Sequence, residues 1–244
     1  GVNSINWARI IAQSVYYFYC YFLAEDENQP INFSVPTGNF GDVYAGYLAK
    51  KLGLPINKLI VATNQNDILH RAISKGKYEA EHVSETISPS MDIQIASNFE
   101  RLIYDLNNHD SSQTLDDMKN IKQNGKYTID VEKLKKINQD FLSARISEQE
   151  TLDVIKNIYE KFNMVLDPHT AIGYGAFDKH DLKGNNIVLA TAHPCKFPDA
   201  ILKAINLKSD LSDELKFILD EKENYGIIEN NLNKIKQYIL GKIK

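Results

Sequence analysis

The segment from Val35 to Gly53 constrains the fold more than any other part of this chain. It reads V-P-T-G-N-F-G-D and continues as V-Y-A-G-Y-L-A-K-K-L-G, which predicts a buried strand, a short glycine loop and an amphipathic helix. Gly38 and Gly41 let the backbone turn sharply and come close to a ligand. Because the first N–H groups of a helix lack partners and carry partial positive charge, the loop is a predicted anion site. The expected anion is a phosphate, although a tight strand-to-helix connection without a ligand fits the spacing equally well.

The composition is that of a globular protein. The chain has 244 residues, of which 43% are hydrophobic and 25% charged, so it can form one large or two small domains. Its net charge of −4 argues against nucleic acid as a partner, because nucleic-acid-binding domains carry a basic surface. Two cysteines, Cys20 and Cys195, make no disulfide framework. We expect both to be buried free thiols, which fits a cytoplasmic location.

The apolar run from Trp7 to Leu23 is too polar for a membrane span. Arg9, Gln13 and several tyrosines interrupt it, and a bilayer needs a longer uncharged stretch. The run also lacks the basic n-region and the small-residue cleavage site of a signal peptide. We therefore expect a helix that is buried on most of its circumference, and no membrane partner.

Helical and strand patterns alternate along the first 76 residues. Asn3 and Ser4 can cap the first helix through their side-chain oxygens. Such alternation predicts a three-layer αβα domain whose sheet is mostly parallel. Ligands of such sheets bind at the carboxyl ends of the strands, where Gly38 falls. The expected elements are a helix over 5–24, a strand over 31–36, a helix ending near 53, a strand over 59–63 and a helix over 67–75.

The remainder of the chain is more polar. Residues 107–123 are rich in Asn, Asp, Ser and Gln and predict a mobile surface insertion. A third core strand is expected over Asn186–Thr191, where five apolar or β-branched residues follow one another. We expect one α/β domain over 1–206 and a charged helical tail over 207–244 that packs on it and breaks at Gly226. The further expected helices cover 98–106, 130–139, 147–162, 167–176 and 198–206.

Five segments, taken in order, resemble the pattern of the threonine synthases. They span residues 2 to about 200, and the resemblance is to the longer bacterial and fungal type, of which they match the C-terminal part. Any one segment could match by chance, but the ordered set is specific. The segments are 2–18 (V-N-S-I-N-W-A-R-I-I-A-Q and V-Y-Y-F), 35–46, 62–67 (A-T-N-Q-N-D), 88–102 (S-P-S-M-D-I and S-N-F-E-R-L) and 167–197 (D-P-H-T-A-I-G and A-T-A-H-P-C-K-F).

This resemblance implies a fold, a cofactor and a reaction. The fold would be the large domain of the tryptophan synthase β-like proteins, which bind pyridoxal 5′-phosphate (PLP). The reaction would be the PLP-dependent conversion of O-phospho-L-homoserine and water to L-threonine and phosphate. The resemblance assigns Gly38, Asn39, Phe40 and Gly41 to the PLP phosphate, mainly through backbone N–H groups. It assigns the hydroxyl of Thr191 to the pyridine nitrogen, whereas a strand-end threonine bonded to backbone is the alternative.

The resemblance also assigns Asn3, Ser4 and Arg9 to the phosphate of a phosphorylated amino-acid substrate. A helix start with an amide, a hydroxyl and a guanidinium suits a phosphate. Arg9 lies in an apolar run, where an unpaired charge would be costly, so a plain surface charge is the weaker explanation. Asp42 would repel a phosphate, and we expect it to cap the following helix.

Two histidines are candidates for proton transfer. We expect His193 to lie beside Thr191 and line the pocket, and His169 to be a packed or hydrogen-bonded residue at a helix start. Neither has zinc-ligand spacing with another His, Cys or acidic residue, so no metal is expected. Lys196 resembles a family position that is not the catalytic one.

We assign no catalytic residue, because the resemblance places the PLP-binding lysine upstream of the Asn3–Arg9 segment. The expected state is therefore a fragment whose partner is a missing N-terminal half. An exposed face where that half would pack could favour self-association. We expect the isolated chain to bind PLP weakly and to be inactive. The alternatives are a related PLP-dependent phospholyase and a non-catalytic phosphate-binding or scaffold protein of the same fold.

Overall fold

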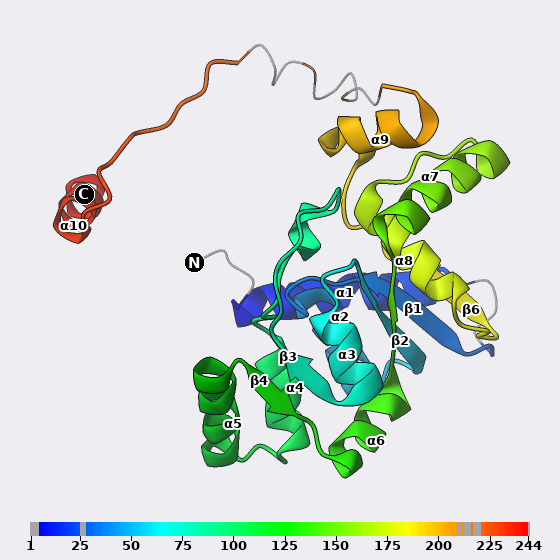
Figure 1. The fold of residues 1–244 in the computed structure, drawn as a ribbon, viewed down its shortest axis with the longest axis horizontal. Coiled ribbons are helices and arrows are strands. Elements are labelled where there is room, and N and C mark those ends of the chain that lie inside the picture. The colour runs from blue at the N-terminus through cyan, green and yellow to red at the C-terminus, as the bar shows by residue number, and fades with distance from the viewer. Residues whose placement is uncertain (1–4, 25–27, 209–210, 212–215, 217–220, 244) are drawn as a thin grey trace. The chain divides into compact units, whose positions relative to one another are not determined.

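The computed structural model describes residues 5–24, 28–208, 211, 216 and 221–243. The chain divides into two compact units, Gly1–Ser209 and Asp210–Lys244 (Figure 1). The second unit contains helix α10 (Leu232–Lys242). Residues 221–231 form no helix, so the expectation of a helical tail is wrong for them. The packing of the tail on the α/β domain stays a prediction.

The first unit is built on a four-stranded sheet in the order β5-β2-β1-β6. Every neighbouring pair is parallel, with Val35 opposite Val61 and Phe33 opposite Ile187. A separate antiparallel pair, β3 and β4, lies outside this sheet. The strands are β1 (Ile31–Pro36), β2 (Ile56–Thr63), β3 (Lys77–Glu79), β4 (Lys126–Thr128), β5 (Phe141–Arg145) and β6 (Asn185–Val188).

Strand β2 explains why the sheet has helices on both faces. Leu59 and Val61 pack into one apolar cluster, whereas Ile60 and Ala62 pack into another. Because successive side chains of a strand point to opposite faces, a continuous apolar run needs cover on both sides. Helix α8 packs on one face, and α2 and α3 pack on the other, with α1 against α2. The predicted three-layer αβα class with a parallel sheet is confirmed.

Most helices begin and end close to the predicted residues. Asp130, Ser147 and Asp167 each cap a helix with a side-chain oxygen, as their positions predict. The α-helices of the first unit are α1 (Trp7–Phe22), α2 (Gly41–Lys51), α3 (Ile68–Lys75), α4 (Phe99–Leu106), α5 (Ser111–Asn124), α6 (Val131–Asp140), α7 (Glu148–Phe162), α8 (Pro168–Asp178) and α9 (Pro198–Ile205); the short 3-10 helices are η1 (Pro89–Met91) and η2 (Pro194–Lys196).

Two expectations about these elements are wrong. The segment 107–123 is mostly helix α5, which Asp110 caps and which buries Thr114 and Ile121; its polar composition hid the few apolar positions that pack. Strand β6 is not a core strand, because it lies at a sheet edge, ends at Val188 and has no fully buried residue. The strand β5 at the opposite edge was not predicted.

Helix α1 also differs from its prediction. Asn6, rather than Asn3 or Ser4, caps it by accepting a hydrogen bond from the Ala8 N–H at 3.0 Å; Asn3 and Ser4 lie outside the described residues. Only Ile10, Ser14 and Tyr17 are fully buried, so the helix is not buried on most of its circumference. No helix in the described residues is long and apolar enough to cross a bilayer. The large exposed apolar side chains of α1 are Trp7, Ile11, Val15, Tyr19 and Phe22.

Candidate anion-binding site

A cavity of about 740 Å³ opens at the carboxyl ends of the adjacent strands β1 and β6. It collects every predicted binding residue that the structure describes, although the sequence spreads them over more than 180 positions. Asn3 and Ser4 lie outside the described residues. The predicted residues that line the cavity are Arg9, Gly38, Asn39, Phe40, Gly41 and Thr191.

The loop between β1 and α2 presents unpaired donors to this cavity. Within the described part of the chain, the backbone N–H groups of residues 38–42 donate no hydrogen bond. Two of them open helix α2, whose N-terminus carries partial positive charge. Gly38 allows the close packing of the loop, because a β-carbon there would collide with the carbonyl oxygen of Ser90. The local geometry therefore suits an anion such as a phosphate.

Phe40 fixes the shape of the loop from inside the protein. Its backbone adopts the left-handed conformation with φ 64° and ψ 4°, which is unfavourable for a bulky residue. Its side chain is 1% exposed and packs against Phe99 and Phe141 at centroid distances of 5.2 and 5.8 Å. Only the backbone of Phe40 can therefore serve a ligand.

Asp42 does not act as the predicted helix cap. Phe40 is the N-cap residue of α2 and makes no side-chain cap hydrogen bond. The Asp42 carboxylate instead accepts hydrogen bonds from the hydroxyls of Tyr16 and Tyr17, and the Tyr17 hydroxyl lies 2.9 Å from the Asp42 carbonyl oxygen. Burial raises the pKa of Asp42, and the two tyrosines and Arg9 partly oppose this. The tyrosines thus bind Asp42 to α1 and join α1 to the loop.

Two basic side chains border the cavity, Arg9 from α1 and Lys196 from η2. Both residues are exposed, so the burial cost that argued against a plain surface charge at Arg9 does not apply. Neither forms an ion pair with another of the described residues. Their positive charges are available to an anion in the cavity.

Thr191 and His193 lie differently from their predictions. Thr191 lines the cavity, but it is exposed and follows the end of β6 by three residues instead of ending a core strand. His193 is exposed and is not one of the lining residues. Its Nδ1 accepts a hydrogen bond from the Cys195 N–H at 3.2 Å and so caps η2. Cys20 and Cys195 are free but only half-buried.

His169 has the predicted place at a helix start, in a hydrogen-bonded setting. It follows the cap residue Asp167 by two positions, and its Nδ1 lies 3.1 Å from Asp167 Oδ1. Burial works to raise the pKa of Asp167, but hydrogen bonds from His169 and Thr170 outweigh burial and hold it below its ordinary value. His169 also lines the cavity, which was not predicted.

Sequence reasoning missed several lining residues. Gln13, Tyr16 and Cys20 line the cavity together with Arg9. Their spacing of i, i+4, i+7 and i+11 places all four on one helical face, and this signal was available in the sequence. Phe197 was missed because it lies between two elements and belongs to no periodic pattern.

A polar network holds the loop that carries Ser90 and Met91. The Asn64 amide donates to Asp92 Oδ1 at 2.8 Å and to Ser88 Oγ at 2.9 Å. The Thr86 hydroxyl also donates to Asp92, at 2.7 Å. These contacts join the end of β2 to η1, which packs against Gly38. The motifs at 62–67 and 88–93 thus support the cavity wall.

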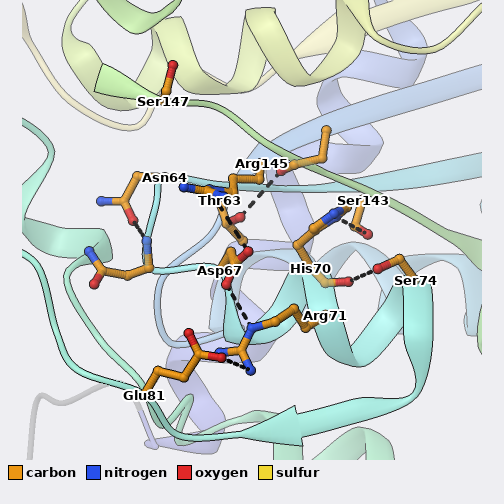
Figure 2. A network of polar contacts seen from close by, with 12 residues as sticks. Thr63, Asn64, Asp67, His70, Arg71, Ser74, Glu81, Ser143, Arg145 and Ser147 are labelled. Carbon is orange, nitrogen blue, oxygen red and sulfur yellow. Dashed lines mark hydrogen bonds and ion pairs between the residues drawn. The ribbon is translucent and has the colours of Figure 1, made fainter. Parts of the chain in front are cut away.

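A second network lies next to the first one, around the start of α3 (Figure 2). Arg71 pairs with Asp67 at 2.8 Å and with Glu81 at 3.0 Å. Nδ1 of His70 lies 3.0 Å from the hydroxyl oxygen of Ser143 on β5. None of these residues lines the cavity, so we assign the network to the support of the fold. Among the described residues, no group of three or more His, Cys, Asp or Glu side chains could hold a metal ion.

Comparisons with known proteins agree with this geometry. A family model described as "Threonine synthase, C-terminal" matches residues 170–239. The threonine synthase of Pseudomonas aeruginosa is 41% identical over 98% of this chain and 52% of its own length. That of Saccharomyces cerevisiae is 43% identical over 97% of this chain and 50% of its own length. The resemblance to the threonine synthase family is confirmed.

Solved threonine synthases share the fold as well. The PLP-bound threonine synthase of Brucella melitensis superposes with a TM-score of 0.93 at 43% identity, over 98% of this chain and 52% of that chain. The yeast threonine synthase gives a TM-score of 0.88 at 41% identity, over 98% of this chain and 53% of that chain. The chain thus spans about half the length of the curated threonine synthases that it matches.

Proposed function

We propose that this chain forms the phosphate-binding part of a PLP-dependent threonine synthase. The whole enzyme would convert O-phospho-L-homoserine and water to L-threonine and phosphate. The observation that carries the proposal is the run of unpaired backbone N–H groups at residues 38–42 beside the cavity. The reaction is inferred from the names of the relatives. The loop offers a site for the phosphate group that both cofactor and substrate carry.

The residues of the cavity fit PLP. The loop at 38–41 would hold the 5′-phosphate through backbone N–H groups, because its glycine allows a close approach and its donors have no other partner. The Thr191 hydroxyl would bind the pyridine nitrogen. When bound, PLP supplies an electron sink for the reacting amino acid.

The basic residues fit the phosphate of the substrate. Arg9 lies one helical turn before Gln13 on the α1 face that borders the cavity, and its guanidinium can donate two parallel hydrogen bonds to a phosphate. We propose that Asn3 and Ser4 act with Arg9, and that Lys196 adds positive charge to the same region. These residues would orient the substrate, whereas none of them carries out the chemical step.

We further propose a protein partner. No lysine of this sequence lies in a motif that resembles the PLP-binding lysine, so the partner would be a polypeptide that corresponds to the part of the relatives not matched here. The exposed apolar face of α1 supports this proposal, because a contiguous apolar surface marks an interaction site. Ile11, Val15 and Tyr19 are 48%, 64% and 64% exposed.

A PLP titration tests the cofactor assignment. Absorbance would report binding, and borohydride reduction with peptide mapping would reveal any lysine bound covalently to PLP. We expect saturable binding without a labelled lysine, and weaker phosphate binding in Arg9→Met than in the wild-type chain. A labelled lysine would show that the catalytic residue lies within this sequence. Absence of binding would favour the non-catalytic scaffold.

A pull-down with the corresponding N-terminal half of a relative tests the partner. We expect Val15→Asp on α1 to abolish association, whereas Val131→Asp, at an exposed position of α6, should not. Product analysis of the complex then separates the two enzymes, since a threonine synthase releases threonine and a phospholyase releases a keto acid and ammonia. Sedimentation of the chain alone would show whether the α1 face mediates self-association instead.

A further inference from the structure

Nε2 of His169 is a buried nitrogen without a partner. The His169 side chain is 5% exposed, and Nε2 makes no hydrogen bond with any of the described residues. Leaving a buried polar atom unpaired costs free energy, and native proteins do so rarely. His169 also lines the cavity, so a ligand bound there is one group that can supply the missing partner.

Asp167 determines which ring nitrogen carries the hydrogen. Its carboxylate is 1% exposed and accepts hydrogen bonds from the Thr170 hydroxyl and from the His169 N–H at 2.8 Å. An ionised carboxylate can only accept, so Nδ1 at 3.1 Å must be the donor. In a neutral imidazole this leaves Nε2 with a free lone pair, which accepts a hydrogen bond.

The imidazole also has an aromatic neighbour. The Phe197 ring packs against it at a centroid distance of 4.9 Å, and Phe197 lines the same cavity. The contact with Asp167 fits a structural histidine, and an unpaired buried Nε2 alone does not set His169 apart, because His180 has one as well. His169 differs in that it lines the cavity, where Asp167 would orient a ring whose other nitrogen serves a ligand.

We propose that Nε2 of His169 binds the phosphorylated ligand of this cavity by accepting a hydrogen bond from one of its O–H or N–H groups. Asp167 is the positioning residue that holds the Nδ1–H tautomer. This inference rests on the proposed function, since it takes the ligand to be PLP or the phosphorylated amino acid. It adds a ligand contact from α8.

Two substitutions test the two ring nitrogens of His169 separately. Asn at position 169 can keep the hydrogen bond to Asp167, but its side chain ends short of the Nε2 position. Gln can reach the Nε2 position but gives up the bond to Asp167. We therefore expect His169→Asn to weaken PLP binding by about five-fold or more, and His169→Gln by about two-fold or less. The urea midpoint should fall more in His169→Gln than in His169→Asn. A purely structural role predicts no loss of affinity in His169→Asn.

His180 provides a matched control. Its Nε2 is also buried without a partner, but His180 is not one of the residues that line the cavity. The change His180→Asn removes the same kind of atom, and we expect the affinity for PLP to stay within about two-fold of wild type. An equal loss of affinity in both Asn variants would overturn the inference, because it would reflect a general loss of stability.

Nitrogen NMR gives a second, direct measurement. We expect the spectrum of the uniformly ¹⁵N-labelled chain to show His169 as the Nδ1–H tautomer, identified by the signal that His169→Asn removes. The Nε2 resonance should move when PLP or O-phospho-L-homoserine is added. Binding of these probes with an unmoved Nε2 resonance would overturn this inference alone. If the wild-type chain binds neither probe, the proposed function fails, and this inference fails with it.

Discussion

Gly38 and Ser90 lie backbone against backbone, so close that a β-carbon on Gly38 would meet the carbonyl oxygen of Ser90. This contact joins the glycine loop to η1, which the Asn64 and Asp92 side chains hold in place. The shape of the anion site therefore depends on two segments that are far apart in the sequence. A change in either segment should alter the site.

Gly38→Ala should damage the site more than Gly41→Ala. At Gly41 an added β-carbon would lie 3.2 Å from Asn98 Nδ2 and 3.5 Å from Ile10 Cδ1, so small side-chain shifts can relieve the contact. At Gly38 the obstacle is backbone, which cannot move without displacing η1. We expect about a ten-fold or greater loss of PLP affinity in Gly38→Ala, from a backbone shift that costs roughly 1–3 kcal/mol. Equal affinities of the two variants in a titration would contradict this prediction.

Gly46→Ala should destabilise the fold. A β-carbon at Gly46 would lie 2.6 Å from Tyr17 Cε1 and 2.9 Å from Leu59 Cδ2, in a core where neither neighbour is exposed. We expect the free energy of unfolding, measured by urea titration, to be about 1–3 kcal/mol lower than in the wild type. The control is Gly175→Ala, where the nearest atoms would be 3.4 Å away; stability there should stay level or rise by up to about 1 kcal/mol.

Tyr17→Phe should cost about 1–2 kcal/mol of stability, because it removes a buried hydroxyl that serves Asp42. The residue is fully buried and lies 3.0 Å from Asp42 Oδ1. A double-mutant cycle with Asp42→Asn should show a coupling of about 0.5–3 kcal/mol. Tyr19→Phe, on the exposed face of α1, should change stability by less than about 0.5 kcal/mol. Additive effects of Tyr17→Phe and Asp42→Asn would show that the two groups do not interact.

Glu150 should make stability depend on pH in the acidic range. Hydrogen bonds from Lys179 and Ser147 lower the pKa of Glu150 from 4.5 to about 2. A folded-state pKa below the unfolded value stabilises the fold above pH 4.5, and this contribution disappears as the pH falls towards 2. Both side chains are about half exposed, so we expect Glu150→Gln to cost only about 0.5–1 kcal/mol at pH 7.

The loss of unfolding free energy caused by Glu150→Gln should shrink between pH 4.5 and pH 2, as measured by urea titrations. Glu132→Gln serves as the control, because Glu132 is 78% exposed in its pair with Lys135, and its deficit should be near zero throughout. A deficit of Glu150→Gln that is constant over this range would mean that the charge of Glu150 does not contribute.

Local sequence signals predicted much of the fold. Strand β1 was predicted at its observed residues, and Asp130, Ser147 and Asp167 marked helix starts correctly. Such signals depend on residues near each other in the chain, as caps and short apolar runs do. Helix α5 was not predicted because few of its residues are buried. The burial of α1 was overestimated because its apolar residues surround the helix, whereas only one face meets α2.

The candidate site was predicted less completely for a physical reason. The glycine loop could be found from sequence because its function lies in its own backbone. By contrast, Ser90, His169 and Phe197 reach the cavity only through the packing of η1, α8 and the η2–α9 junction. No pattern near these residues reveals which strand end they will approach. The resemblance to the threonine synthases covered the segments 88–102 and 167–197, which contain these residues. It did not predict that Ser90, His169 and Phe197 would line the cavity.

The burial of Phe40 has a consequence for how a ligand is captured. Because the ring is held between Phe99 and Phe141, folding itself fixes the unfavourable backbone of the loop, and binding has no further ordering of that backbone to bring about. Affinity for a phosphate then loses little to conformational entropy. Association should follow a single concentration-dependent step without a slow closure of the loop, so the site acts as a rigid receptor that exists before its ligand arrives.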